Sequence, residues 1–273
     1  MHTRTIPSSG IALPVVGCGT WIGFDVAARP AELPQRTGVL SALFDAGGRV
    51  VDSSPMYGSA EQVVGQLLEA GGAQERAFLA TKVWTTGKRA GIAQMERSMA
   101  LLRTRHIDLL QVHNLVDWRT HVDTLRDWKA QGRVSHIGVT HYTESAHAEL
   151  GQVLATTALD FVQFNYSIAD RNAEKRLLPL AAERGVAVLV NLPFGGGHVL
   201  KSLRSRPLPE WAAAIGCTSW NQLLLKFVLA QPAVTCVIPG TSSPQHMRDN
   251  ATAGAGELPD AAFWTDKLAA LGF

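Results

Sequence analysis

The polar residues that could do chemistry stand at or just after the ends of three short apolar segments: Asp52, Tyr57, Lys82 and His113. If neighbouring parallel strands carry these segments, the four side chains meet at the carboxyl end of a sheet or barrel, where α/β folds place their active sites. A tyrosine hydroxyl beside a lysine ammonium suits proton delivery to a carbonyl oxygen. A nearby carboxylate would keep the ammonium charged, and the imidazole could hydrogen-bond the same oxygen.

The elements that must position these residues recur with a regular period. Apolar, β-branched segments begin near Val15, Val50, Phe78, Ile107, Val134, Phe161, Val186 and Val234. Six of the seven intervals are 25 to 35 residues, the length of one strand and a returning helix, and the last is 48 residues. Amphipathic segments at 36–45, 61–69, 92–102, 122–130, 145–155, 173–184 and 219–230 fill the gaps.

Eight such units predict an α/β fold, a (β/α)₈ TIM barrel, as a single domain over residues 1–273. Residues 1–14 hold two short apolar segments around Ser8-Ser9-Gly10 and predict an N-terminal β-hairpin that closes the barrel floor. Residues 260–271 predict a short C-terminal helix. A doubly wound open sheet is the alternative, but no Gly-x-Gly-x-x-Gly follows the first strand, which disfavours it.

Composition and charge argue against several classes of binding partner. The chain has 25 basic and 23 acidic residues without a basic stripe, which argues against nucleic acid or an anionic membrane as a partner. No apolar segment reaches the roughly 20 residues of a membrane span, and the N-terminus does not resemble a signal peptide, so we expect a cytoplasmic protein. Cys18, Cys217 and Cys236 are far apart and predict buried thiols. The segment from His141 to His147 departs from metal-binding spacing, so we predict no metal.

Several motifs together resemble an aldo-keto reductase. The matching stretches are Gly17-Cys18-Gly19-Thr20-Trp21, Asp52-Ser53-Ser54-Pro55-Met56-Tyr57-Gly58, Thr81-Lys82-Val83-Trp84, Asp108-Leu109-Leu110-Gln111-Val112-His113, Ile137-Gly138-Val139, Val162-Gln163-Phe164-Asn165-Tyr166-Ser167 and Ile238-Pro239-Gly240. They follow the family's order over residues 15 to 250. The resemblance implies hydride transfer from NADPH, with NADH possible, to an aldehyde or ketone. It makes Tyr57 the general acid, assisted by Lys82, Asp52 and His113.

The resemblance also implies where the cofactor binds. Ser243 and Pro244 suit the N-cap and first residue of a helix whose free N–H groups could face phosphate oxygens. The adenosine end would lie here, with Arg248 on a 2′-phosphate and Asn250 on adenine. The other implied cofactor residues are Thr20, Trp21, Thr140, His141, Gln163, Asn191, Pro193, Phe194, Gly195, Gly197, Gly240, Thr241 and Ser242. Gly195-Gly196-Gly197 would form a flap over the pyrophosphate, with a tight turn as the alternative.

Some of these positions depart from the family pattern. Gly240 stands where many members have lysine, Asn191 replaces an aromatic residue that stacks on the nicotinamide, and His141 replaces an asparagine. The departures at Asn191 and His141 leave open a second function, a nicotinamide-binding sensor or accessory barrel that acts through protein contacts. A metal-dependent barrel hydrolase is a weaker third hypothesis.

Tryptophans that follow predicted strands suggest the substrate pocket. Trp21, Trp84 and Trp118 are the predicted walls of a cleft for a small carbonyl compound. The other four are predicted to serve packing: Trp128, Trp211, Trp220 and Trp264. We expect a monomer or a weak homo-oligomer.

Overall fold

Eight parallel strands form one sheet in the order of the sequence, from β3 to β10. The computed structural model describes residues 1–27 and 29–273. The strands are β3 (Cys18–Gly19), β4 (Val50–Asp52), β5 (Phe78–Val83), β6 (Ile107–His113), β7 (Val134–Thr140), β8 (Phe161–Asn165), β9 (Ala187–Asn191) and β10 (Val234–Val237). Parallel bridges join Val16 to Val237 and Gly19 to Gly240, so the first and last strands meet and the sheet closes into a barrel.

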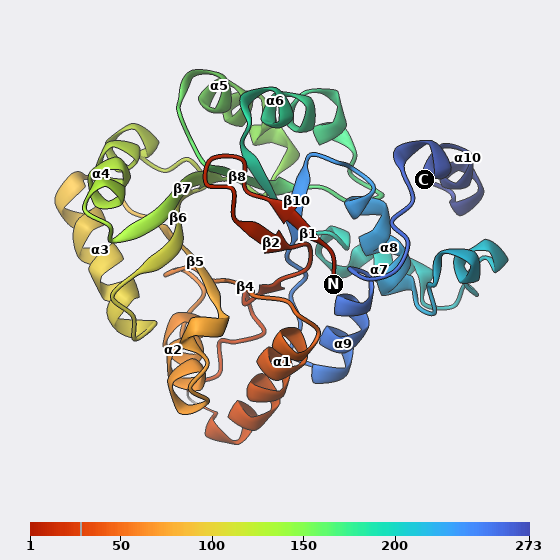
Figure 1. Cartoon of the computed structure of the whole chain (residues 1–273), viewed down its shortest axis with the longest axis horizontal. Helices are drawn as coiled ribbons and strands as arrows, with labels where there is room; N and C mark the ends of the chain where they lie inside the picture. Colours follow the sequence, from red (N-terminus) through yellow and green to blue (C-terminus); the bar gives the residue numbers. More distant parts are fainter. Residues whose placement is uncertain (28) are drawn as a thin grey trace.

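Helices surround the closed sheet (Figure 1). They are α1 (Leu33–Asp45), α2 (Ala60–Ala70), α3 (Lys88–Leu101), α4 (Trp118–Ala130), α5 (His147–Thr156), α6 (Leu177–Arg184), α7 (His198–Leu203), α8 (Trp220–Leu229), α9 (Pro244–Thr252) and α10 (Ala261–Leu271). The long interval before β10 holds α7 and a 3₁₀ segment, Glu210–Ile215, in addition to α8. The (β/α)₈ barrel with a C-terminal helix is therefore confirmed, and the doubly wound alternative was wrong.

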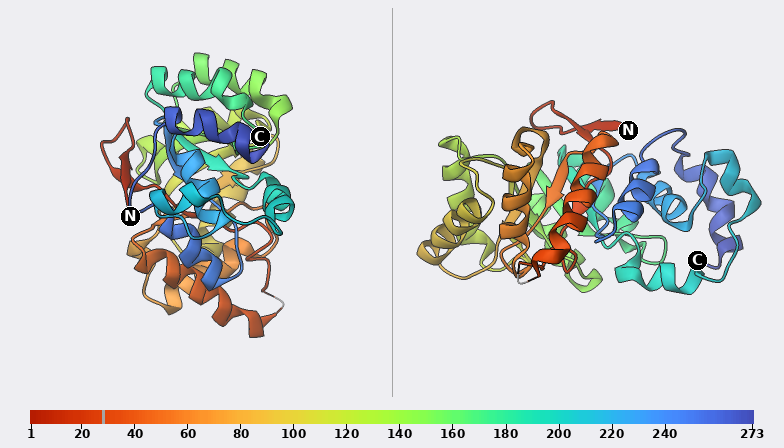
Figure 2. Two further views of the ribbon diagram at one scale, coloured as in Figure 1. Left: turned by 90° about the vertical axis from the view of Figure 1, so that its right-hand side faces the viewer. Right: turned by 90° about the horizontal axis from the view of Figure 1, so that it is seen from below.

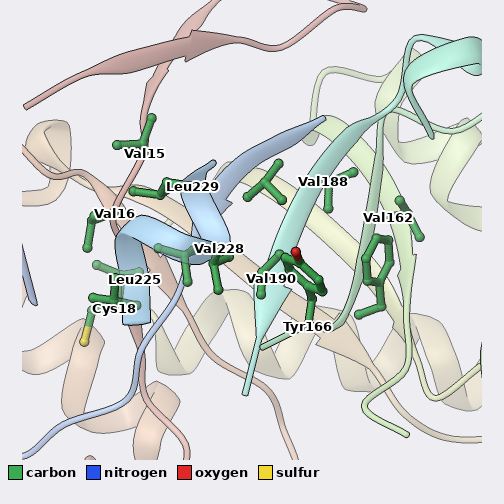
Figure 3. Packing of buried hydrophobic residues seen from close by; sticks show 14 of the residues in the cluster. Val15, Val16, Cys18, Val162, Tyr166, Val188, Val190, Leu225, Val228 and Leu229 are labelled. Atoms are coloured by element: carbon green, nitrogen blue, oxygen red, sulfur yellow. The ribbon is translucent and has the colours of Figure 1, made fainter. Parts of the chain in front are cut away.

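Alternate residues of each strand enter two different cores, because side chains on a strand point to opposite faces. The outer core lies between strands and helices; Figure 3 shows Leu225, Val228 and Leu229 of α8 packed near Val188 and Val190 of β9. The inner core fills the barrel and consists of Val50, Phe78, Ala80, Leu109, Phe161, Ala187, Leu189, Cys236 and Ile238, with Ile6 and Leu13. The three cysteines are buried free thiols, as predicted.

The predicted N-terminal hairpin is present and seals one end of the barrel. β1 (Thr3–Thr5) and β2 (Ala12–Pro14) pair antiparallel, and Figure 2 (right) shows them at one end of the molecule. Ile6 and Leu13 belong to the inner core. Arg4 donates to the carbonyl of Gln231 at 2.8 Å, and Ser9 Oγ lies 2.9 Å from His136 Nε2. The opposite end, where the strands have their carboxyl termini, is left for the site.

One predicted helix is interrupted. The segment 173–184 contains a 3₁₀ turn, Asn172–Lys175, and then α6, with Arg176 outside helical geometry between them. Pro179 explains the break, because its ring would clash with the carbonyl of Lys175 in a continuous helix. The predicted N-cap of α9 is confirmed, since Ser243 Oγ accepts from the backbone N–H of His246. No helix in the part of the chain that the structure describes is both long and apolar enough to cross a membrane.

Candidate active site

The four candidate catalytic residues lie together at the carboxyl ends of β4, β5 and β6. Lys82 Nζ donates to Asp52 Oδ2 at 2.6 Å and to the carbonyl of Ser53 at 2.7 Å. It also lies 5.0 Å from the centroid of the Tyr57 ring. The Tyr57 ring meets the His113 ring edge-on, with centroids 5.9 Å apart. The parallel register of adjacent strands therefore brings these side chains together.

The Asp52 carboxylate is held from several strands. Besides Lys82 on β5, it contacts Gln163 on β8, whose Nε2 donates to Asp52 Oδ1 at 3.1 Å. Gln111 Nε2 on β6 approaches the same oxygen at 3.4 Å. Thr20 Oγ1 donates to the backbone carbonyl of Asp52 at 3.0 Å. Because the three contacts to the carboxylate come from β5, β6 and β8, it has little freedom to move away from Lys82.

The Asp52 carboxylate keeps Lys82 charged. Burial alone would lower the pKa of the Lys82 ammonium, but the Asp52 charge and Tyr57 raise it by more, so its pKa lies above the ordinary value. The pKa of Tyr57 is also raised, because burial of the phenol outweighs the opposing effect of Lys82. From the sequence we expected Lys82 to lower this pKa; its charge acts in that direction but does not prevail. Tyr57 is therefore a protonated acid at neutral pH.

His113 is neutral at physiological pH. Burial lowers its pKa to about 2, and the nearby charge of Lys82 acts in the same direction. Its Nδ1 lies 3.0 Å from Ser54 Oγ. A neutral imidazole carries one N–H and one lone pair, so it can give a single hydrogen bond to a ligand in the cleft.

A cleft of about 760 Å³ opens beside these residues. Most of the predicted site residues line it, namely Asp52, Tyr57, His113, Thr20, Trp21, Trp84, Thr140, Gln163, Asn191, Pro193, Phe194, Gly197, Gly240, Thr241, Ser242 and Asn250. Lys82 lies just beneath the lining and is 1% exposed. Among the lining residues that the structure describes, Asp52 is the only Asp, Glu, Lys or Arg.

The arrangement fits an amide-bearing group near Tyr57. Thr140 Oγ1 donates to Gln163 Oε1 at 3.0 Å, and Gln163 in turn donates to Asp52. Asn191 Nδ2 donates to the carbonyl of His141 at 3.2 Å. Asn191 Oδ1 is buried without a partner among the described residues. This oxygen is therefore an available acceptor for an N–H of a bound ligand.

Besides Lys82, four predicted residues do not line the cleft: His141, Gly195, Arg248 and Trp118. The Arg248 guanidinium is exposed and donates to Gln245 Oε1 at 3.2 Å, whereas His246 lines the cleft in its place. Helix spacing would have indicated this, because His246 and Asn250 are four residues apart on one face of α9 and Arg248 is not on that face.

The local structure explains why His141, Trp118 and Gly195 do not line the cleft. His141 stacks on Tyr142, with ring centroids 5.6 Å apart, and Tyr142 lines the cleft instead. Trp118 is the first residue of α4 and packs against the outer core. The Gly195–Gly197 segment is a 3₁₀ turn with positive φ at all three glycines, and it leads directly into α7. The tight-turn alternative therefore describes its conformation here.

An apolar rim surrounds the cleft, and the sequence predicted only Trp21 and Trp84 of it. Its members are the exposed lining residues Trp21, Ile22, Met56, Trp84 and Tyr142. Ile22, Met56 and Tyr142 follow β3, β4 and β7, so their place just beyond a strand was a usable signal. Further lining residues that were missed are Gly19, Gly23, Asn114, Leu192, Leu200, Asn221, Ile238 and His246. Clustered exposed apolar side chains mark a binding surface.

Three residues of the cleft lining have a left-handed backbone conformation. Ile22, Asn114 and Leu192 have φ of 60°, 53° and 48°. A left-handed conformation is costly for residues other than glycine, above all for branched ones. Such strain persists where the surrounding structure enforces it, which is common at ligand sites.

Comparison with known proteins agrees with this geometry. The model of the aldo/keto reductase family matches residues 15–265. The chain belongs to the aldo/keto reductase family. Members of this family are NAD(P)H-dependent oxidoreductases, so the cleft is that of an enzyme.

Individual relatives span nearly the whole chain. Methylglyoxal reductase YeaE of Escherichia coli (strain K12) is 29% identical over 270 residues, 96% of this chain and 93% of that protein. The NADH-specific methylglyoxal reductase of the same organism is 25% identical over 319 residues, 96% of each. An aldo/keto reductase from Klebsiella pneumoniae, solved in complex with NADP and acetate, has a TM-score of 0.83 and 28% identity, covering 99% of this chain and 95% of that one.

Proposed function

We propose that this protein reduces an uncharged aldehyde or ketone with NADPH, and that Tyr57 gives the proton to the carbonyl oxygen. The observation that carries the proposal is the buried Lys82–Asp52 pair placed against the Tyr57 ring at the wall of the cleft. The related enzyme from Klebsiella pneumoniae was solved with NADP, which supports the choice of cofactor. NADH is the second candidate, since one relative is named as NADH-specific.

In this proposal the chain supplies the proton and stabilises the charge. A bound nicotinamide cofactor supplies the hydride. Tyr57, whose raised pKa keeps it protonated, donates to the oxygen as negative charge develops there. The adjacent Lys82 ammonium stabilises the phenolate that remains, and Asp52 holds that ammonium in place. His113 hydrogen-bonds the same oxygen and fixes its position.

The cofactor residues follow from the cleft lining. We assign the adenosine end to Thr241 and Ser242, just before α9, and to Asn250 within it; the backbone N–H groups and the dipole at the start of this helix favour phosphate. We assign the carboxamide end to Thr140, Gln163 and Asn191, which face the cleft with free acceptor capacity. Arg248 would need to move from Gln245 to reach a 2′-phosphate, so we give it no role.

The lining also indicates the substrate. Because Asp52 is the only charged lining residue among those described and is paired with Lys82, the cleft offers no free cation to a carboxylate or phosphate. The apolar rim of Trp21, Ile22, Met56, Trp84 and Tyr142 provides area for an aromatic or aliphatic group. We therefore propose uncharged carbonyl compounds with an apolar substituent as preferred substrates.

The test is consumption of NADPH in the presence of aldehydes, ketones and dicarbonyls. Tyr57→Phe should lower kcat by roughly 10²- to 10⁴-fold, the usual contribution of general acid catalysis, without changing the melting temperature by more than a few degrees. Tyr166→Phe is the matched control, because Tyr166 is buried outside the cleft and donates to Glu174; it should retain kcat. Tight cofactor binding without turnover of any carbonyl would instead favour the sensor hypothesis.

A further inference from the structure

Ser54 is a buried hydroxyl in contact with a catalytic candidate. It lies two residues beyond the end of β4 and has no solvent exposure. Its Oγ is 3.0 Å from Nδ1 of His113, at the end of β6. The pair therefore bridges two neighbouring strands directly behind the cleft wall.

The other hydrogen-bond donor near Ser54 decides whether Ser54 Oγ or His113 Nδ1 is the donor in their hydrogen bond. The backbone N–H of Met56 approaches Ser54 Oγ at 3.4 Å, and this group can act only as a donor. Among the described residues, the hydroxyl has one further hydrogen-bond partner, Nδ1 of His113. If Nδ1 donated as well, the hydroxyl hydrogen would be buried without an acceptor, which is unfavourable. The satisfied arrangement has Ser54 donating to Nδ1.

We propose that the Ser54 hydroxyl holds His113 in the tautomer that carries its proton on Nε2, so that the ring presents a hydrogen-bond donor to the cleft. Ser54 is thus a positioning residue that acts through His113. Its benefit to catalysis depends on the proposed function, since a substrate carbonyl oxygen can only accept. The other tautomer would direct a lone pair at that oxygen and repel it.

The neighbouring serine provides a matched control. Ser53 is also fully buried, and its Oγ lies 3.0 Å from Thr20 Oγ1, which can accept the Ser53 hydroxyl hydrogen while donating its own to the carbonyl of Asp52. Among the described residues it makes no hydrogen bond with His113. Ser53→Ala and Ser54→Ala therefore remove the same atom from adjacent buried positions, and only the second removes the partner of Nδ1.

The direct test is nitrogen NMR of protein labelled with ¹⁵N-histidine, in which protonated and bare ring nitrogens are well separated. The His113 signals are assigned by their loss in His113→Gln. We expect the wild type and Ser53→Ala to carry the proton on Nε2 at pH 7, and Ser54→Ala to show a mixture of tautomers. A wild-type His113 protonated on Nδ1, or an unchanged Nε2 tautomer in Ser54→Ala, would overturn the proposal.

Kinetics test the consequence for catalysis. Ser54→Ala should lower kcat/KM by about threefold to tenfold, the range that one hydrogen bond supports, with cofactor affinity unchanged. Ser54→Thr keeps the hydroxyl and should restore the Nε2 tautomer and most of the lost rate. If no variant or wild type turns over a carbonyl, the proposed function fails, yet the NMR result still decides the role of Ser54.

Discussion

At the scale of single residues, the Asp52–Lys82 ion pair is unusual because both of its charges are buried. Both side chains are almost fully buried, and each charge depends on the other for compensation. Removing one partner of such a pair is far more costly than removing both, because the remaining charge stays buried and unpaired. The pair therefore couples the stability of the barrel to the chemistry at its rim.

Asp52→Asn should lower the free energy of unfolding by about 3–5 kcal/mol, because it leaves the Lys82 ammonium buried without a counter-charge. The double variant Asp52→Asn with Lys82→Met should recover much of this loss in urea denaturation, yet remain inactive. The pKa of Lys82 is raised in the folded state, so the ion pair stabilises the wild-type fold fully below the unfolded pKa of about 10.4. This stabilisation is lost as pH rises through the folded pKa of Lys82. An Asp52→Asn protein as stable as the wild type would refute this account.

At the scale of elements, the sequence predicted the strands and the four-residue cluster well, because period and strand ends are local features. It did not predict which side chains a loop or helix turns toward the cleft. Trp84 lies one residue beyond β5 and stays at the rim. Trp118 follows a turn in which Asn114, Leu115 and Asp117 have positive φ, and this turn carries it into α4. Arg248 likewise lies outside the cleft lining, because it is on a different face of α9 from His246 and Asn250.

A buried glutamate links three elements around β5. Glu61 of α2 accepts hydrogen bonds from Thr81 Oγ1 on β5 at 2.5 Å and from Ser98 Oγ on α3 at 3.1 Å. Burial raises its pKa, although these hydroxyls and the Lys82 charge oppose the shift. The folded state therefore binds the Glu61 proton more tightly than the unfolded state does.

Glu61→Gln should raise the free energy of unfolding at pH 7 by about 1 kcal/mol, because a neutral amide replaces a buried carboxylate. The sign follows from the raised pKa: the stabilising effect of protonated Glu61 is complete below the unfolded pKa of about 4.3 and disappears as pH rises through the folded value. The advantage of the variant should thus vanish near pH 4. Glu69→Gln, on the exposed surface of the same helix, should change stability by less than about 0.5 kcal/mol at either pH. Equal effects of the two substitutions in denaturant titrations would contradict this interpretation.

At the scale of the whole molecule, charge and apolar surface are segregated. The chain has a net charge of +2, but its charged residues lie away from the cleft lining apart from Asp52. Five of the six large apolar side chains exposed among the described residues form the rim, and the sixth, Ile11, directly precedes β2 in the N-terminal hairpin. Net charge was readable from the sequence, whereas this distribution depended on how the barrel places its loops.

Met56→Lys should shift substrate preference toward anionic carbonyls. Met56 is 39% exposed and adjoins Tyr57, so a lysine there adds a cation to a rim that has none. The ratio of kcat/KM for 4-carboxybenzaldehyde over benzaldehyde should rise by roughly fivefold at low salt, since an exposed pair contributes about 1 kcal/mol. Ile11→Lys is the matched control, because Ile11 is 45% exposed on the hairpin. A ratio that rises equally in both variants would show that overall charge, and not the rim, sets the preference.

The hairpin has a consequence for how the chain is made. Arg4 finds its carbonyl partner in Gln231, 227 residues later. At about 5–20 residues per second, a ribosome needs roughly 10 to 45 seconds to synthesise that interval. Throughout this time Ile6 and Leu13 are available to chaperones or to water, since the strands that will enclose them do not all exist. The hairpin is translated before the barrel strands and is thus among the last parts of the core to be enclosed.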